Sequence, residues 1–343
     1  MSASKWTGMR EVVPQTPRVI AVVGPTATGK TRLAEDLAIG LRGEVVTADA
    51  MQVYRGMDVG TAKIPVSKRR VNHWCIDEVE PGEPFSAALY QKLSRGVIDD
   101  LLAAGKTPVV AGGTGLYVRA ALDDMRFPGG EKTSQTRARL EDLAQRLGSE
   151  AMHDRLREVD PAAADLIHPN NVRRTIRALE MAEQGVLYSE QAGGFRERKP
   201  FYDAQFIGLA ATRESLYERI DERVDAMLAA GLLAEVEALL ASGFRDALTA
   251  TQAIGYKEFV SVIEGGANLQ EAAGAVKQAT RRYAKRQLTW FRADPRVRWI
   301  DVTDLTPEQA ASAAFDLLSS GRPAGYPEGI EDATPRLAPD VAD

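Results

Sequence analysis

The stretch Gly24-Pro25-Thr26-Ala27-Thr28-Gly29-Lys30-Thr31 follows the pattern G-x-x-x-x-G-K-[ST] of a phosphate-binding loop, or P-loop. The apolar run at residues 19–23 before it predicts a buried parallel strand, and the pattern at residues 32–38 after it predicts a helix. Backbone N–H groups and the positive end of the dipole at such a helix N-terminus bind phosphate. Lys30 adds a mobile positive charge, and the Thr31 hydroxyl can ligate a Mg²⁺ ion that accompanies the phosphates. The sequence therefore predicts an α/β fold with a phosphate site, although the loop does not identify the phosphate compound.

The composition is that of a globular protein. The chain has 343 residues, of which 44% are apolar, so it is long enough for one large domain with an insertion or for two domains. No stretch approaches the roughly 18 uninterrupted apolar residues of a membrane span, and residues 1–17 lack the apolar segment of a signal peptide. The single cysteine, Cys75, excludes an internal disulfide and a thiolate-rich zinc site. We therefore expect a cytoplasmic protein with no membrane contact.

The net charge of −5 is unevenly distributed along the chain. Residues 301–343 carry nine acidic and two basic side chains, so residues 1–300 have a net charge of +2. A basic surface on the body of the protein is compatible with the acidic total, and a nucleic-acid partner stays open.

Two further strand ends carry polar or small residues. Residues 44–48 predict a strand that ends at Asp49, and residues 108–111 predict a strand that runs into Gly112-Gly113-Thr114-Gly115. Because ligands of open parallel sheets bind beyond the carboxyl ends of the strands, Asp49 either lies near the phosphates or caps the turn that follows. Many nucleotide hydrolases place an acidic Mg²⁺ ligand where this chain has glycines. The pattern therefore favours a small-molecule kinase or another phosphate-handling enzyme.

The character of the sequence changes at about residue 125, where an Arg-rich stretch without strand patterns begins. We therefore expect an N-terminal extension (1–18), a catalytic core (19–124 and 204–321), an inserted helical domain (125–203) and a disordered acidic tail (322–343). The clearest helix of the insertion follows Asn171 and places Arg173 and Arg177 on one face. On the pattern alone, such a face is more often solvated than a binding surface.

The helix after the strand predicted at 205–209 also carries arginines. Thr212 is its expected cap. Its apolar row consists of Leu216, Ile220, Val224 and Met227. Beside this row lie Arg219 and Arg223, which either pair with acidic neighbours on the surface or bind phosphate.

Basic residues dominate the stretch 274–298. Lys277, Arg281 and Lys285 recur every four residues and form a stripe on one helix face, with Arg282 next to it. Such a stripe either follows an RNA backbone or is a solvated face over an aromatic core. A last helix is predicted to begin with a capping box of Thr306 and Gln309 and to end before residue 321.

Five separated blocks of the sequence resemble one family, the bacterial tRNA dimethylallyltransferases, also called tRNA isopentenyltransferases. The blocks are Gly-Pro-Thr-Ala-Thr-Gly-Lys-Thr at 24–31, Asp-Ala-Met-Gln-Val-Tyr-Arg-Gly-Met-Asp-Val-Gly-Thr-Ala-Lys at 49–63, Gly-Gly-Thr-Gly-Leu-Tyr at 112–117, Gln-Ala-Ile-Gly-Tyr-Lys-Glu at 252–258 and Arg-Arg-Tyr-Ala-Lys-Arg-Gln-Leu-Thr-Trp-Phe-Arg at 281–292. The resemblance covers roughly residues 19–301, and the second and fifth blocks together are highly specific. It implies a P-loop NTPase-like parallel sheet flanked by helices, with an inserted helical domain.

The family transfers a dimethylallyl group from dimethylallyl diphosphate to the exocyclic amine of the adenine immediately 3′ of the anticodon in tRNA, and it releases diphosphate. By this resemblance Asp49 is the general base, Thr31 is the Mg²⁺-linked threonine, and Arg223 holds the diphosphate together with residues 24–31. The resemblance also implies residues that contact the tRNA, namely Asp49, Ala50, Met51, Gln52, Thr114, Arg137, Arg173, Arg174, Arg177, Gln252, Gly255, Tyr256 and Lys257, to which we add Arg281 and Arg282. The expected partners are the tRNA anticodon stem-loop and dimethylallyl diphosphate, the expected cofactor is Mg²⁺, and the expected state is a monomer.

Two positions depart from the family pattern. Ala50 stands where the family usually has Ser after the catalytic Asp, so a hydroxyl that could orient the base or contact the RNA is missing. We expect activity to survive this change. Trp74 follows His73 where the family often has a second His.

Three other functions fit parts of the sequence. A small-molecule kinase of the shikimate or nucleoside type would bind ATP in the same loop but would have little use for the basic stripe. A prenyltransferase for free adenine nucleotides would not need the inserted domain. An RNA-binding NTPase switch would leave the RNA unmodified.

Overall fold

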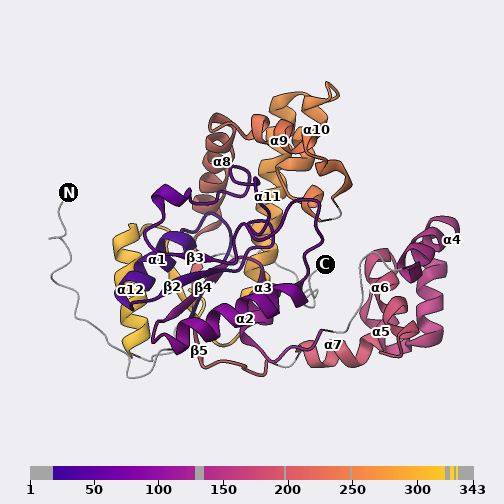
Figure 1. Ribbon diagram of the computed structural model, residues 1–343, viewed down its shortest axis with the longest axis horizontal. Helices are drawn as coiled ribbons and strands as arrows, with labels where there is room; N and C mark the ends of the chain where they lie inside the picture. Colours follow the sequence, from indigo (N-terminus) through magenta and orange to yellow (C-terminus); the bar gives the residue numbers. More distant parts are fainter. Residues whose placement is uncertain are drawn as a thin grey trace. The chain divides into compact units, whose positions relative to one another are not determined.

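The computed structural model describes residues 18–127, 135–196, 198–247, 249–320, 325–327 and 330. The N-terminal extension and the acidic tail expected from the sequence lie almost entirely outside the described residues. The chain divides into two compact units (Figure 1). The first contains the described residues 18–122 and 202–330, and the second comprises Asp123–Phe201.

The described part of the first unit is built on a parallel sheet with the strand order β3-β2-β4-β1-β5-β6. The strands are β1 (Val19–Val23), β2 (Glu44–Thr47), β3 (His73–Trp74), β4 (Pro108–Gly112), β5 (Ala204–Ala210) and β6 (Val297–Asp301). The register aligns Val23 with both Gly112 and Gly208, so the loops after β1 and β4 begin at the same edge of the sheet. The predicted parallel α/β sheet is confirmed.

Helices cover both faces of this sheet. The flanking helices are α1 (Lys30–Gly40), α2 (Ala87–Ala103), α3 (Gly115–Leu122) and α12 (Pro307–Ser320), and a short 3₁₀ helix, η1, covers Val66–Lys68. Ile20 and Val22 of β1 join Leu33 and Leu37 of α1 and Ala314 of α12 in one buried cluster. Helices α2 and α3 contact each other and strands β2 and β4, and they cover the opposite face. Burial on both faces explains why the central strands are continuous apolar runs.

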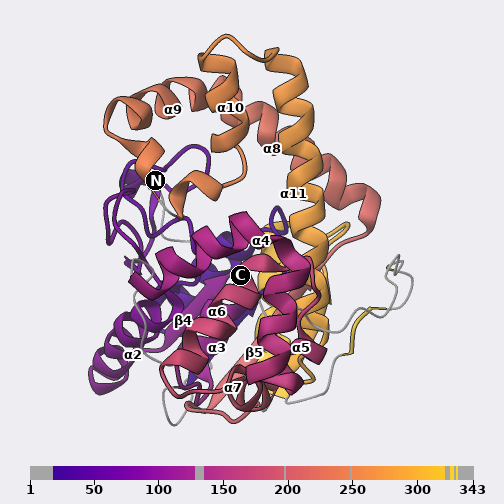
Figure 2. The ribbon, with the colours of Figure 1, turned by 90° about the vertical axis from the view of Figure 1, so that its right-hand side faces the viewer.

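The remaining helices of the first unit stand together at one side of the sheet in both views (Figure 1, Figure 2). They are α8 (Arg213–Ala229), α9 (Leu232–Ala241), η2 (Phe244–Asp246), η3 (Ala250–Gln252), α10 (Tyr256–Ile263) and α11 (Leu269–Arg292). Helix α11 contacts α8 and α10, and α9 contacts α8 and α10, so the four α-helices form one packed group. No helix among the described residues is long and apolar enough to cross a lipid bilayer.

Several helix ends follow the capping chemistry in the sequence. Ser86 and Asn171 accept hydrogen bonds from the backbone amides of Leu89 and Arg174. The capping box of α12 is present, because Thr306 and Gln309 exchange backbone-to-side-chain hydrogen bonds of 2.8 and 3.3 Å. The Asn171 cap and the capping box of α12 confirm the helix starts predicted there.

The predicted position of Thr212 as a helix cap is confirmed, but the hydrogen bond expected from its side chain is not formed. Thr212 occupies the N-cap position of α8 but its side chain makes no capping bond, and its backbone N–H donates to the Thr303 hydroxyl. The loop after β6 therefore binds the start of α8 in place of a cap.

The basic stretch 274–298 also does not form one helix. Helix α11 ends at Arg292, and Arg298 lies on β6, where it donates to the carbonyl of Leu317 and the side chain of Gln205. Arg296 pairs with Asp294.

The second unit is helical. It contains α4 (Gln135–Val159), α5 (Pro161–Leu166), α6 (Val172–Glu183) and α7 (Tyr188–Arg196). Gly148, with a φ of +83°, bends α4 at a point where an L side chain would be strained. Leu140, Met152, Leu156 and Ile176 form the centre of its own apolar cluster.

Candidate active site

The phosphate loop joins β1 to α1 in a conformation that depends on small residues. Gly24 has a φ of +137°, and a Cβ at this position would lie 2.5 Å from the carbonyl oxygen of Leu209 on β5. Gly29, with a φ of +85°, is the N-cap of α1, and Ala27 has a φ of +63°, which non-glycine residues seldom adopt. The loop thus wraps around the N-terminus of α1, where its amide groups can bind an anion.

Two cations lie close to the loop. The Lys30 amine donates a 2.6 Å hydrogen bond to the carbonyl of Pro25. Desolvation by burial and then the charge of Arg223 lower the pKa of Lys30 to about 7, against the opposing effect of Asp49. Desolvation likewise lowers the pKa of Arg223, again against the charge of Asp49. A bound anion would stabilise the charged forms of both side chains. Thr31, the next residue of α1, is exposed.

Asp49 follows β2 at the carboxyl edge of the sheet. Its Oδ1 accepts hydrogen bonds from the backbone N–H groups of Met51 at 2.9 Å and Gln52 at 3.4 Å. The same side chain lines a cavity and acts electrostatically on Lys30 and Arg223. The two alternatives for Asp49, turn cap and site residue, are therefore combined in one carboxylate.

Gln287 of α11 fixes the phosphate loop to the end of β4. Its side chain is buried, and its Oε1 accepts a 2.8 Å hydrogen bond from the N–H of Thr26. Its Nε2 donates a 3.0 Å hydrogen bond to the carbonyl of Gly113. One side chain thereby sets the spacing between the two loops, a role that the sequence analysis missed.

The glycines of the 112–115 block allow α11 to approach β4 closely. A Cβ at Gly113 would clash with the Gln287 amide, and a Cβ at Gly115 would clash with the indole of Trp290. Tyr283, Gln287 and Trp290 recur at intervals of four and three residues, which is the spacing of one helix face. That spacing is the feature of the sequence from which this contact face could have been identified.

Tyr283 and Thr114 complete the arrangement around Asp49. The Thr114 hydroxyl accepts a 3.0 Å hydrogen bond from the N–H of Ala50, and Tyr283 hydrogen-bonds to the side chains of Thr114 and Gln287. Burial and then the charge of Asp49 raise the pKa of Tyr283 to about 12, so its hydroxyl stays protonated. The backbone after Asp49 is thus held by the loop after β4, which in turn contacts Tyr283 of α11.

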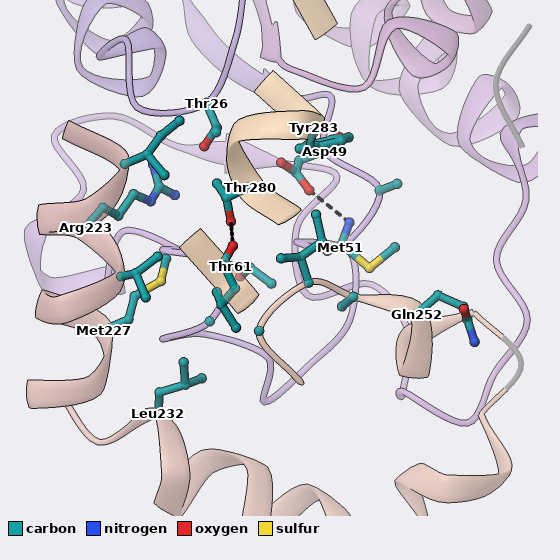
Figure 3. A pocket seen from close by; sticks show the side chains of 18 of the residues that line it. Thr26, Asp49, Met51, Thr61, Arg223, Met227, Leu232, Gln252, Thr280 and Tyr283 are labelled. Atoms are coloured by element: carbon teal, nitrogen blue, oxygen red, sulfur yellow. Dashed lines mark hydrogen bonds between the residues drawn. The ribbon is translucent and has the colours of Figure 1, made fainter. Parts of the chain in front are cut away.

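A cavity of about 250 Å³ opens beside these groups. Its polar lining includes Thr26, Asp49, Arg223, Thr280 and Tyr283, with Arg286 of α11 also at the wall. Its apolar lining comes from Ile220, Val224, Met227, Leu232, Ile254 and Val276. In Figure 3 the side chains of Thr26, Asp49 and Tyr283 lie towards the top of the view, whereas Met227 lies below them at the left and Leu232 lies lower still. The cavity suits a ligand with a phosphorylated head and a short apolar group.

The block at 252–257 contributes both exposed and buried residues. Gln252 and Lys257 are exposed, whereas Gly255 and Tyr256 are buried. The Tyr256 hydroxyl donates a 2.6 Å hydrogen bond to Glu235. Gln52, another expected tRNA contact, donates from Nε2 to the carbonyl of Thr61. Tyr256 therefore has a structural position in the described conformation.

The basic stripe on α11 is partly neutralised. Lys277 forms an ion pair with Asp225, and Arg281 forms one with Asp221, both across the contact between α11 and α8. Arg282 is exposed. The stripe is thus divided between packing against α8 and an exposed basic face.

In the second unit, a buried carboxylate organises two of the expected arginines. Glu180 is 1% exposed, and Arg177 donates to it at 2.8 Å while Arg137 lies 4.0 Å away. Arg173 is exposed, and the backbone N–H of Arg174 donates to the cap of α6. The structure therefore brings Arg137 and Arg177 together around one negative charge.

Trp74 has a structural role at the edge of the sheet. Its indole N–H donates a 2.6 Å hydrogen bond to Glu44, which also pairs with Lys106. His73 hydrogen-bonds to the buried Glu35, and desolvation lowers its pKa despite that partner. Both residues thus tie β3 to neighbouring elements.

The parallel sheet and the loop at residues 24–31 define a protein of the P-loop class. Residues 52–294 match the family model described as IPP transferase. Curated tRNA dimethylallyltransferases of Geobacillus thermodenitrificans and Caldanaerobacter subterraneus are 48% and 43% identical over 86% and 88% of this chain, and over 93% and 98% of their own length. The chain therefore belongs to the IPP transferase family.

Solved structures agree with this assignment. The tRNA isopentenylpyrophosphate transferase of Bacillus halodurans is 41% identical with a TM-score of 0.67, and the match covers 89% of this chain and 96% of that chain. A eukaryotic dimethylallyltransferase acting on tRNA has a TM-score of 0.74 at 28% identity, over 90% of this chain and 81% of that chain. Membership of this transferase family excludes the small-molecule kinase alternative.

Proposed function

We propose that the protein transfers a dimethylallyl group from dimethylallyl diphosphate to the exocyclic amine of the adenine 3′ of the anticodon in tRNA. The observation that carries this proposal is the cavity that places Asp49, Arg223 and Thr26 of the phosphate loop beside an apolar lining of a size suited to a five-carbon group. An enzyme that acts on tRNA works where tRNA is found, so we propose that it acts in the cytoplasm; that it is a monomer is a separate proposal, tested by its mass in solution.

The residue types suit this chemistry. An adenine amine is a weak nucleophile because its lone pair is delocalised into the ring. Asp49 would remove a proton from the amine as the carbon–nitrogen bond forms, and the carbon–oxygen bond to diphosphate would break. Lys30, Arg223 and the loop amides would stabilise the charge that gathers on the leaving diphosphate. The adenine must leave its stack to reach Asp49, which costs a few kcal/mol. Contacts to the RNA backbone would offset that cost.

The residues near the loop fit a Mg²⁺ ion that the diphosphate brings with it. Mg²⁺ commonly keeps several waters and takes one or two protein ligands in addition to substrate phosphates. Among the described residues no group of three or more His, Cys, Asp or Glu side chains gathers, and Thr31 offers an exposed hydroxyl at the start of α1. We infer that Thr31 holds the ion, which when bound supplies positive charge to the leaving group.

We propose that the RNA contacts the exposed basic residues of the first unit, led by Arg282, and the arginines of the second unit, Arg137, Arg173, Arg174 and Arg177. Gln252 and Lys257 would contribute from the exposed side of their block. Ala50 leaves the hydroxyl of Thr114 as the nearby group that orients the backbone after Asp49.

Mass spectrometry of nucleosides tests the proposed reaction. The purified protein is incubated with Mg²⁺, dimethylallyl diphosphate and an anticodon stem-loop that has adenine 3′ of the anticodon, without ATP. We expect a prenylated adenosine. A matched stem-loop with guanosine at that position should stay unmodified, and the absence of product from several adenine stem-loops would exclude the proposal.

Asp49→Asn tests the general base more sharply than removal of the side chain. The amide keeps an oxygen that can accept from Met51 and Gln52, so the turn is preserved, but it cannot take a proton. We expect kcat to fall by at least about a hundredfold, the scale of general-base catalysis, with dimethylallyl diphosphate binding nearly unchanged. Single-turnover kinetics and calorimetry measure the two quantities. Near-normal transfer by this variant would remove Asp49 as the base.

A further inference from the structure

Glu235 of α9 binds three consecutive backbone amides of the loop between β2 and β3. Its Oε2 accepts from the N–H groups of Asp58 at 2.9 Å and Val59 at 2.7 Å, and its Oε1 accepts from the N–H of Gly60 at 3.0 Å. Successive amides that point to one place form a nest, which binds anions. In this protein the anion is a side chain from a helix 175 or more positions away in the sequence.

A fourth hydrogen bond brings in α10. The hydroxyl of Tyr256, the first residue of α10, donates to Oε1 of Glu235 at 2.6 Å. Tyr256 is fully buried, and its ring lies so close to Gly60 that a Cβ there would be 2.6 Å from the ring. Burial and then the charge of Glu235 raise the pKa of Tyr256, so the phenol stays a donor. Glu235 therefore joins residues 58–60, α9 and the start of α10.

The cavity of about 250 Å³ beside Asp49 is called the donor cavity from here on. Each of these three segments, or a residue next to it, forms part of the wall of this cavity. Gly60 and Thr61 come from the loop, Leu232 comes from the first turn of α9, and Ile254 comes from the segment before α10. Glu235 itself does not line the cavity, and its carboxylate accepts hydrogen bonds from residues 58–60 and Tyr256. Its carboxylate therefore binds segments of the cavity wall and not the groups proposed to react.

We propose that Glu235 is a positioning residue that keeps the apolar wall of the donor cavity closed, and that it thereby sets the affinity for the dimethylallyl group and the limit on prenyl chain length. The inference rests on the proposed function, because it takes a prenyl diphosphate as the ligand. The cavity of about 250 Å³ is smaller than the roughly 300–1,000 Å³ of sites for drug-sized ligands. We therefore expect a ten-carbon chain to depend on movement of this wall more than a five-carbon chain does.

Glu235→Gln is the variant that tests this inference. It keeps the size of the side chain but replaces one acceptor oxygen with an NH₂ group that faces N–H donors. With an anticodon stem-loop as acceptor, we expect the KM for dimethylallyl diphosphate to rise about tenfold and kcat to stay within about twofold of wild type, because hydrogen bonds to a charged group are among the stronger ones. We also expect geranyl diphosphate to compete better relative to dimethylallyl diphosphate, with the ratio of Ki to KM about tenfold lower than in wild type.

Glu237→Gln is the matched control. Glu237 lies on the same helix, is exposed and lines no part of the cavity. Its substitution should therefore leave the KM for dimethylallyl diphosphate and the ratio of Ki to KM at their wild-type values. Should Glu235→Gln fail to fold, Tyr256→Phe removes one of the four hydrogen bonds and keeps the buried ring. It should raise the donor KM and lower the ratio of Ki to KM, as expected for Glu235→Gln.

The inference is overturned by unchanged donor KM and unchanged chain-length ratio in a folded Glu235→Gln enzyme, or by a loss confined to kcat. Failure of the proposed function is a different result, in which wild-type protein gives no prenylated RNA. Calorimetric binding of dimethylallyl and geranyl diphosphates to the RNA-free protein then still measures the effect of Glu235.

Discussion

At the scale of single residues, we expect Lys30 to couple donor binding to proton uptake. Its pKa of about 7 means that most of this amine is neutral at pH 8 in the protein without ligand. A diphosphate beside it favours the charged form and raises the pKa. We therefore expect the donor to bind together with a proton and its affinity to fall as the pH rises above about 7, because the free protein must gain the proton that binding requires.

Titration calorimetry measures this uptake. We expect the wild-type protein to take up most of one proton when dimethylallyl diphosphate binds at pH 8 in EDTA, measured in two buffers with different ionisation enthalpies. Lys30→Arg stays charged throughout this pH range and should show almost no uptake. A wild-type enthalpy that is independent of the buffer contradicts the assignment of this pKa to the loop.

The sequence indicates the side chains that are expected to take part in the reaction more readily than the side chains that hold them in place. The position of Asp49 directly after a strand fits both a residue of the ligand crevice and a turn cap, and the resemblance to the family favours the first. Gln287 and Glu235 are polar residues within amphipathic helices, where the pattern fits a solvated residue equally well. Their roles depend on which backbone amides the tertiary fold brings near them, and no local pattern contains that information.

At the scale of elements, the exposed face of α11 should determine how RNA binding depends on salt. Arg282 is exposed, whereas Arg281 and Lys277 are engaged with acids of α8. We expect Arg282→Glu to weaken stem-loop binding and to reduce the slope of log affinity against log salt concentration by about 1, the value for one lost phosphate contact.

Lys92→Glu makes the same charge change on the exposed face of α2 and serves as the control. Filter-binding titrations at several salt concentrations give both slopes. Equal slopes for Arg282→Glu and Lys92→Glu would show that α11 has a solvated face with no RNA contact.

The second unit contains an element that should respond to acid. Asp160 caps α5 by accepting from the N–H of Ala163 at 3.0 Å and also accepts from the N–H of Ser189 at 2.9 Å. Desolvation acts to raise the pKa of Asp160, but these hydrogen bonds outweigh it and lower the pKa. Its contribution to stability is therefore present above the ordinary aspartate pKa of about 4 and is lost as the pH falls through the lowered value.

We expect Asp160→Ala to destabilise the second unit by about 2 kcal/mol at pH 7, from a lost cap and an unpaired buried amide. The difference from wild type should shrink at pH 3. Urea unfolding, monitored through hydrogen exchange of the α5 amides, measures the difference in the free energy of unfolding at pH 7 and at pH 3. Asp165→Ala on the exposed side of α5 is the control. A constant difference across this pH range would argue against the charged cap.

Elements with strong local patterns were predictable, and short or mixed ones were not. Strands β1 and β4 are continuous apolar runs, β2 and β5 contain shorter ones, and the capping box of α12 and the Asn cap of α6 mark helix starts. β3 has two residues, and β6 includes Arg298 and Asp301 after a basic helix, so neither shows a strand pattern. Pairing with the sheet gives them their conformation, which is a tertiary effect.

At the scale of the whole molecule, the second unit should be separable from donor binding. It leaves the first unit after Leu122, and the N–H of Tyr202 donates a 3.4 Å hydrogen bond to the Leu122 carbonyl, so the two junctions meet. The donor cavity is lined by first-unit residues only. A short Gly-Ser linker in place of residues 123–201 should therefore leave a folded protein that binds dimethylallyl diphosphate.

We expect this shortened protein to bind the anticodon stem-loop at least about tenfold more weakly and to prenylate it poorly, since phosphate contacts supply much of the affinity for RNA. Calorimetry with the donor and filter binding with the stem-loop separate the two effects. Unchanged stem-loop affinity would assign RNA recognition to the first unit alone.

The hydrogen bond from Thr26 to Gln287 is a physical link through which binding at the phosphate loop can affect the proposed binding of RNA at α11. The phosphate loop is attached to α11, the same helix that presents Arg282 on its exposed face. If both ligands restrain that helix, the first to arrive meets the entropic cost of ordering it and the second does not. Donor and RNA then bind with positive cooperativity, and linkage requires that each raises the affinity for the other by the same factor, whichever binds first.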